Sequence, residues 1–242
     1  MRIPSLLLRR IHKWIGLVIG LQFVIWSLSG AMMAWLDMDE VAGGASRPAA
    51  AAPALPAPSA WPILRRQLDD IPLTGVIVRP LLGRHVFEVT TPVGAMLFDA
   101  ATGRRVRVDA ALARSIAAAA YAGNGDVIAV RKIPELTLAV REHQLPIWRI
   151  DFADEEISSY YVSASTGQLL ERRNDSWRLW DFFWMLHNMD YVNRTSFNHP
   201  LIITVAFAMI WLAITGFYLL FRTAWKPDLR ALKRLVLKRR AG

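Results

Sequence analysis

The chain has 242 residues, of which 54% are apolar, and it contains no cysteine. The sequence therefore excludes disulfides, thiolate metal sites, iron–sulfur clusters and cysteine nucleophiles. A formal net charge of +9 would suit nucleic acid, but 12 of the 29 basic residues and only one of the 20 acidic residues lie in 1–13 and 222–242. The remainder is slightly acidic. This distribution argues against nucleic-acid binding and is typical of basic segments that flank a membrane.

Two long runs without a charged residue predict transmembrane helices at 14–36 and 200–221. At 1.5 Å per residue the first run extends roughly 34 Å, enough to cross the hydrocarbon core. A cleaved signal peptide has a shorter apolar region of about 7–15 residues, so we interpret the first run as a span. The basic residues at the outer ends of both runs predict a bacterial inner-membrane protein with cytoplasmic tails at 1–13 and 222–242.

Small residues in the first span indicate a close contact with a neighbouring surface. Gly16 and Gly20 stand four residues apart, and Ser29, Gly30 and Ala31 follow toward the end of the run. Such residues let another helix approach: the second span, a second copy of the chain, or a flat cofactor. General bundle packing is the simpler alternative. Two helices enclose little interior, so besides the lipid bilayer we expect a homo-oligomer or a partner protein.

The region between the spans is expected on the periplasmic side. Residues 37–60 form an Ala/Pro linker, which predicts a semi-extended spacer. A weak repeat follows, with one unit at 61–108 and another at 109–173. Each unit is predicted to contain a helix, at 61–70 and 110–122, followed by three short antiparallel strands.

The repeat is clearest at its turns. The first unit has the sequence DAATG at 99–103 and the second has SASTG at 163–167. The glycine is expected to supply a positive φ, and the threonine is expected to bond nearby backbone. An aromatic interfacial segment at 174–199 then leads to the second span, and its part 177–188 is predicted to be an amphipathic helix.

The chain resembles the PepSY domain and PepSY-associated transmembrane helix family, of the iron-regulated membrane protein type. The residues that carry this resemblance are RRIHKWIG at 9–16, WMLHNMDY at 184–191, FNHPL at 197–201 and Thr215-Gly216. Larger relatives have four spans, whereas this chain has two. The resemblance implies a membrane α-helical plus α+β fold, in which two transmembrane helices flank a periplasmic domain of two PepSY-like helix-plus-antiparallel-sheet units.

Some members of this family resemble haem-bearing reductases that move electrons across the membrane, for example to ferric siderophores. A haem b needs two axial imidazoles, a dry apolar slot and basic groups near its propionates. On this resemblance His187 and His199, at one membrane face, are the candidate pair for haem or metal, and Arg194 is the candidate propionate partner. The segment 193–196 would fold back between them. His12 lies across the bilayer, roughly 30 Å away, and would need a second haem and a histidine from another chain.

Other functions stay open. The three histidines also suit interfacial residues that bond headgroups, backbone or Asp190, and His12 suits a basic anchor. His85 and His143 are expected on the surface. No P-loop, dinucleotide fingerprint, zinc-protease motif or nucleophile elbow occurs, so no catalytic residue is predicted. The candidate functions are a haem-carrying component of a membrane reductase with a redox partner, a membrane-tethered binding or regulatory module, and an accessory subunit.

Overall fold

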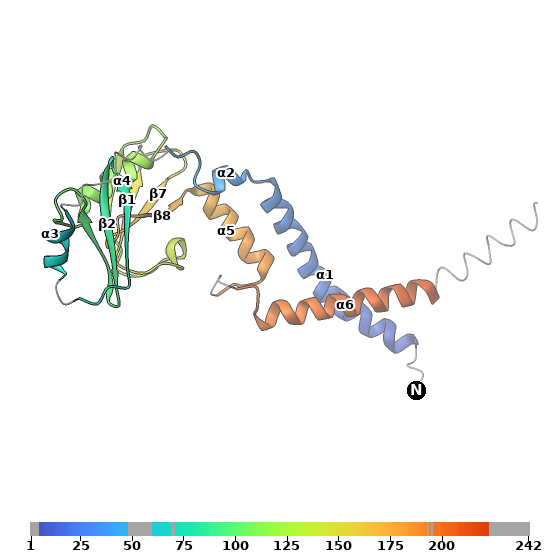
Figure 1. Ribbon diagram of the computed structural model, residues 1–242. Helices are drawn as coiled ribbons and strands as arrows, with labels where there is room; N and C mark the ends of the chain where they lie inside the picture. Colours follow the sequence, from blue (N-terminus) through green and yellow to red (C-terminus); the bar gives the residue numbers. More distant parts are fainter. Residues whose placement is uncertain (1–4, 48–59, 69–70, 193, 195, 223–242) are drawn as a thin grey trace, which may run out of the picture. The chain divides into compact units, whose positions relative to one another are not determined.

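The computed structural model describes residues 5–47, 60–68, 71–192, 194 and 196–222 (Figure 1). Half of the predicted linker and nearly all of the predicted C-terminal tail lie outside these described residues. The chain divides into two compact units. We call Met1–Trp35 with Asp181–Gly242 the helical unit, and Leu36–Trp180 the sheet unit. The boundary between them falls within helix α5 (Asp175–Asn188).

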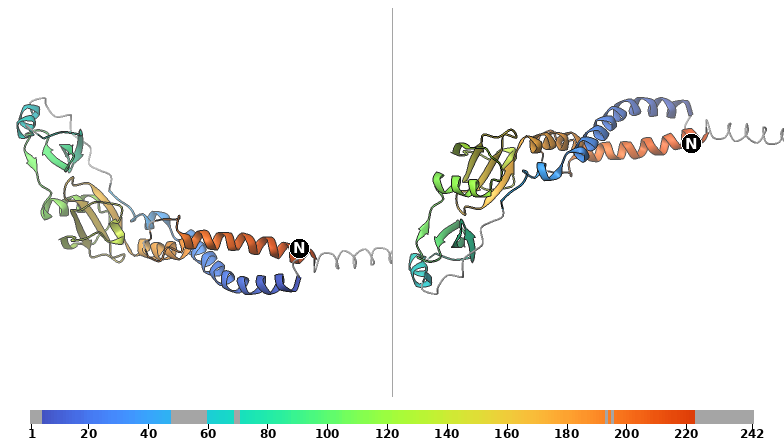
Figure 2. Two further views of the ribbon diagram at one scale, coloured as in Figure 1. Left: turned by 90° about the horizontal axis from the view of Figure 1, so that it is seen from below. Right: turned by 90° about the horizontal axis from the view of Figure 1, so that it is seen from above.

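The helical unit contains two long apolar helices, α1 (Ser5–Trp35) and α6 (Pro200–Leu220), which contact each other (Figure 2). Both are long and apolar enough to cross a membrane. Helix α6 begins at the predicted residue, since proline suits a first helical turn, where its missing N–H costs nothing. Helix α1 begins nine residues before the predicted span, because the charges that end a hydrophobic run do not end a helix.

Of the two glycines that predict a close helix contact, only one faces α6. A Cβ built on Gly16 would lie 3.8 Å from the side chain of Leu212, whereas a Cβ on Gly20 would meet nothing within 4 Å. Gly16 therefore lies where α1 and α6 approach, and Gly20 faces open space.

The sheet unit contains two four-stranded antiparallel sheets, and in each the strands follow one another in chain order. The first sheet has strands β1 (Gly75–Leu81), β2 (Arg84–Thr91), β3 (Gly94–Asp99) and β4 (Arg105–Val106). The second has β5 (Val127–Lys132), β6 (Ile147–Phe152), β7 (Ser159–Ser163) and β8 (Leu169–Arg173). The helical elements of this unit are α2 (Met38–Val41), α3 (Ala60–Gln67), α4 (Ala110–Ala120) and the 3₁₀ turn η1 (Leu138–Val140).

Each sheet has one strand more than the sequence predicts. The additional strands, β1 and β5, come first in their sheets and lie at an edge. Pro80 lies within β1 and argues against a strand when the sequence is read alone. An edge position tolerates proline, because the outer N–H groups of an edge strand have no partner to lose.

The turns of the repeat have the predicted backbone. Gly103 and Gly167 both adopt φ = +66°. In each turn a side chain at the first position accepts hydrogen bonds from the backbone three residues on: Asp99 Oδ1 from Thr102 N at 2.9 Å, and Ser163 Oγ from Thr166 N at 3.1 Å. The two units thus turn their chains in the same way at equivalent positions.

One apolar core joins the two sheets. Leu97 of β3 and Ile150 of β6 belong to the same cluster, and Ala113 and Ile116 of α4 lie within it. The opposite face of the first sheet packs against α3, where Leu64 is 1% exposed. The first sheet is therefore covered on both faces, which explains why four consecutive residues of β2 are buried.

Candidate functional site

The imidazole of His187 lies against α1 of the helical unit. Its ring stacks on Trp26 with centroids 4.7 Å apart and an interplanar angle of 21°. A Cβ built on Gly30 would lie 2.9 Å from Cε1 of His187, closer than side chains normally approach. Glycine at this position is therefore what allows the ring to rest on the helix backbone. We call His187 with Trp26, Ser29 and Gly30 the first histidine site.

Hydrogen bonds at this site fix the tautomer of His187. Nδ1 lies 3.1 Å from the carbonyl oxygen of Trp26 and 3.3 Å from Ser29 Oγ. The Ser29 hydroxyl itself donates to the Trp26 carbonyl at 2.9 Å. Because a carbonyl can only accept, Nδ1 carries the proton and donates it, and Nε2 keeps its lone pair. A ring held in this way is suited to ligation through Nε2.

His12 makes an equivalent set of contacts with α6. Its Nδ1 lies 2.8 Å from Oγ1 of Thr215, and that hydroxyl donates to the Trp211 carbonyl at 2.8 Å. Since the hydroxyl proton is already used, Nδ1 of His12 is the donor and Nε2 again keeps its lone pair. A Cβ on Gly216 would lie 3.4 Å from Cε1 of His12. We call His12 with Trp211, Thr215 and Gly216 the second histidine site.

The two histidine sites share a pattern that the sequence analysis missed. In each, a tryptophan is followed three or four residues later by a hydroxyl residue and then a glycine, as Trp26…Ser29-Gly30 and as Trp211…Thr215-Gly216. The recurrence of this pattern in both apolar helices is the sequence signal that predicts the two histidine sites. The sequence alone does not indicate that a histidine from another segment of the chain contacts each pattern.

His199 has a different role in the structure. Its Nε2 lies 2.8 Å from the carbonyl oxygen of Asn188, so Nε2 is the protonated nitrogen of this ring. It is also the residue that precedes the first turn of α6. Among the described residues, the hydrogen bonds and ring contacts of His187 reach α1, those of His199 reach Asn188, and none joins the two rings.

The segment between α5 and α6 folds back on the end of α5. Arg194 pairs with Asp181 at 2.9 Å, and the Asp181 side chain is 5% exposed. The Ser196 amide donates to Asp190 at 3.3 Å. The Asn188 side chain is 1% exposed, and its amide nitrogen has no hydrogen-bond partner within the described part of the chain. Arg194 thus pairs with a buried carboxylate. The Asn188 amide, at the end of α5, is the donor in this region that has no partner among the described residues.

The helical unit offers single imidazole side chains rather than a preformed metal cluster. No group of three or more histidine or acidic side chains in the described ranges is arranged to hold a metal ion. Among the described residues no hydrogen bond reaches Nε2 of His187 or of His12. Each site could therefore offer one imidazole nitrogen to a haem, which would need a second imidazole at each site.

The other two histidines, His85 and His143, lie in the sheet unit. His143 pairs with Glu171 at 2.8 Å. Asp154 accepts from Tyr121 Oη and from the Ser158 amide, both at 2.8 Å. Burial alone would raise the pKa of Asp154, but the hydrogen bonds from Ser158 and Tyr121 outweigh it and lower the pKa below its ordinary value of 3.8.

Tyr121, Asp154 and Ser158 line a cleft of about 860 Å³ in the sheet unit. The pKa of Tyr121 is raised by burial and by the neighbouring Asp154 carboxylate. Three further carboxylates line the same cleft, from Glu40, Glu155 and Glu156. The cleft therefore has an acidic wall.

Two apolar helices of membrane-spanning length joined to an α+β unit of two antiparallel sheets define a class of membrane protein with an extramembrane domain. The family model of the PepSY-associated TM region matches residues 9–242, and the chain belongs to this family. This confirms the resemblance found in the sequence. No curated protein and no solved structure is similar enough to match the chain.

Proposed function

We propose that this PepSY-family membrane protein is a haem-carrying component of transmembrane electron transfer, for example in ferric-siderophore or flavoprotein-linked reduction. The observation that carries the proposal is the geometry of the first histidine site. His187 donates Nδ1–H to a backbone carbonyl, and no other described residue bonds its Nε2. Imidazoles that ligate metals are commonly held by this kind of bond, which fixes the ring and raises its basicity.

The surroundings of His187 support ligation in three ways. Trp26 stacks on the ring and excludes water from one face. Gly30 leaves room for the ring against the helix, and Arg194 brings a guanidinium to the same end of the unit. When bound, a haem supplies a one-electron carrier whose potential is set by its axial ligands and by the polarity around it.

His199 is the second ligand that the sequence predicts at this end. Ligation through its Nε2 requires its bond to Asn188 to break, because that nitrogen carries the proton. A second copy of the chain is the alternative source of the imidazole, and the same source would complete the second histidine site around His12. Electrons would come from another protein, since the sequence has no flavin or nicotinamide motif.

The orientation in the membrane is part of the proposal. By the positive-inside rule, the basic residues of 1–13 and 222–242 support a cytoplasmic side for both ends of the chain in a bacterial cell. The sheet unit then lies in the periplasm. In this orientation the first histidine site faces the periplasmic half of the inner membrane and the second faces the cytoplasmic half.

An absorption spectrum tests the haem. The full-length protein would be purified in detergent from cells supplied with a haem precursor, and spectra recorded oxidised and after dithionite. We expect a sharp reduced α-band that is lost or shifted in His187→Ala. His143→Ala removes a histidine of the sheet unit and should leave the band unchanged. Loss of the band in His199→Ala would identify the second ligand, and its persistence would point to a second copy.

A featureless spectrum from the folded wild-type protein would overturn the proposal. So would a band that His187→Ala and His12→Ala leave untouched. A featureless result would favour the second candidate function, a membrane-tethered binding or regulatory module without a redox role. The observation behind that candidate is the large acidic cleft of the sheet unit, because a cleft of about 860 Å³ is large enough to receive a ligand or part of a partner.

A further inference from the structure

A second cleft in the sheet unit combines an apolar floor with a rim of arginines. Its volume is about 640 Å³, within the usual range for small-molecule sites. Leu81 and Ile116, which are 6% and 7% exposed, form the floor together with Leu169. The rim carries the side chains of Arg47, Arg79 and Arg172. The cleft thus offers a dry surface and positive charge side by side.

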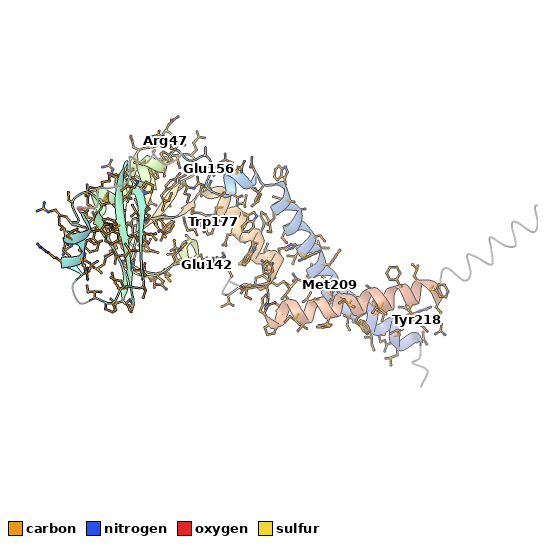
Figure 3. The ribbon with its side chains drawn as sticks, viewed as in Figure 1. Arg47, Glu142, Glu156, Trp177, Met209 and Tyr218 are labelled. Carbon is orange, nitrogen blue, oxygen red and sulfur yellow. The ribbon has the colours of Figure 1, made fainter. Side chains whose placement is uncertain are left out.

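Elements from across the sheet unit bring the arginines together. Ser46 bridges to Tyr121, and the Arg47 amide donates to the carbonyl of Ala120 at 2.9 Å. These bonds hold Arg47 beside the end of α4 (Figure 3). Arg172 comes from β8, and its guanidinium donates to the carbonyl of Gly44 at 2.9 Å. Arg47 is thus held by backbone bonds to α4, and Arg79 and Arg172 belong to strands β1 and β8.

Only one of the three guanidinium charges is neutralised. Arg79 pairs with Glu88 at 2.6 Å, and Gln168 also bonds that carboxylate. Arg172 donates to the carbonyl of Gly44 and also bonds the Tyr160 hydroxyl, and among the described residues no acceptor contacts the exposed side chain of Arg47. Within the described residues no carboxylate forms an ion pair with Arg47 or Arg172, so the cleft keeps two uncompensated positive charges.

We propose that this cleft binds a small organic anion with an apolar, ring-sized body. The anionic group would be held by Arg47 and Arg172, since guanidinium groups bond carboxylates and phenolates strongly in partly dry surroundings. The apolar body would lie on Leu81, Ile116 and Leu169. This site is separate from the histidine sites, and the proposal does not rest on haem.

Isothermal titration with 2-naphthoate tests the proposal on the full-length protein in lipid nanodiscs. Empty nanodiscs give the background, and neutral 2-naphthamide has the same ring without the charge. We expect saturable binding of one naphthoate per chain and roughly tenfold weaker binding of the amide, because a charge-assisted bond is lost. Arg47→Gln should weaken naphthoate binding by a similar factor. Ala119→Phe, which places a ring inside the cleft, should abolish it.

Arg107→Gln is the matched control. It removes an exposed arginine of the same unit that does not line the cleft, and naphthoate binding should be unchanged. Arg47→Gln alters an exposed side chain without an ion pair, so circular dichroism should show an intact fold. Naphthoate binding no stronger than to empty nanodiscs, equal binding of the amide, or unchanged binding in Arg47→Gln would each overturn the proposal.

Discussion

Among the described glycines of the helical unit, Gly30 has the least room for a side chain. The imidazole of His187 rests on its α-carbon, and a methyl group there would lie 2.9 Å from the ring. The ring cannot retreat without leaving Trp26, on which it stacks, and the Trp26 carbonyl that it bonds. The stacking and the hydrogen bond of His187 therefore both depend on residue 30 being a glycine, which has no side chain.

Gly30→Ala should destabilise the full-length protein by about 1–3 kcal/mol, the usual cost of overpacking a filled contact. Gly20→Ala is the matched control, because a Cβ there meets nothing within 4 Å, and it should be neutral or slightly stabilising. Thermal unfolding in detergent, followed by circular dichroism, measures both. Equal melting temperatures for the two variants would show that the ring does not rest on Gly30.

A second residue-scale prediction concerns Asp154. Its pKa is lowered in the folded state, so its carboxylate stabilises the sheet unit at pH values above the ordinary value of 3.8. That contribution is lost as pH falls below 3.8 through the lowered folded-state pKa. Asp154→Ala should therefore cost about 2 kcal/mol near pH 6, and the difference from wild type should shrink in stronger acid.

Urea unfolding of the full-length protein between pH 6 and pH 3, followed by near-UV circular dichroism, measures this difference. Glu155→Gln removes the neighbouring charge, and Glu155 makes no hydrogen bond among the described side chains. It should cost less than Asp154→Ala near pH 6. A constant difference between Asp154→Ala and wild type over the whole pH range would contradict the prediction.

At the scale of secondary-structure elements, the second sheet is held together by a carboxylate as well as by its ladder. Asp151 of β6 accepts from Arg149 Nε and from Ser159 Oγ of β7, both at 2.7 Å. Its other oxygen lies 2.9 Å from Arg131 of β5. One side chain, 12% exposed, thus joins three neighbouring strands.

Asp151→Ala should lower the free energy of unfolding by about 3 kcal/mol, since it leaves the partly buried guanidinium of Arg149 without its carboxylate. Arg131→Ala removes the exposed member of the same network, whose side chain is 56% exposed, and should cost less than about 1 kcal/mol. Chemical denaturation of both variants gives the two values. If Arg131→Ala lowered the free energy of unfolding as much as Asp151→Ala, the stabilisation would come mainly from the ion pair between Arg131 and Asp151.

The elements that the sequence predicts well are those with strong local signals. The apolar run at 200–221 coincides almost to the residue with helix α6, because a proline and a charge bound it. Strands β1 and β5 were missed because edge strands need no regular alternation and tolerate residues such as Pro80. Local pattern fixes an element only where burial is one-sided and continuous.

The candidate site was less accessible from the sequence. His187 and His12 were named, but their contacts with Ser29-Gly30 and Thr215-Gly216 depend on which helices meet, and spacing along the chain does not encode this. The predicted pairing of Arg194 with a propionate stays a prediction. In the structure Arg194 pairs with Asp181, a buried partner about a dozen residues earlier that no motif singles out.

At the scale of the whole molecule, the sheet unit should unfold in one step, because both sheets contribute to one core. Leu97→Ala in the first sheet and Ile150→Ala in the second should each cost about 2–5 kcal/mol and lower the same transition. Val93→Ala, at a position that is 94% exposed, should leave it unchanged. Hydrogen exchange followed by mass spectrometry would show both sheets losing protection together. Loss confined to the mutated sheet would mean two independent domains.

The unequal lengths of α1 and α6 have a consequence for the bilayer in which the protein is stable. Helix α6 spans about 32 Å, close to a hydrocarbon thickness of about 30 Å, whereas the apolar helix at Leu6–Trp35 spans about 45 Å. The longer helix can adapt to a change of bilayer thickness by tilting. Its additional length includes Arg9, Arg10 and Lys13 near its N-terminal end. The shorter helix has no additional length with which to adapt. Hydrophobic mismatch should therefore affect α6 and the adjoining residue His199 before it affects α1. We expect the protein to be less stable in thick bilayers than in thin ones.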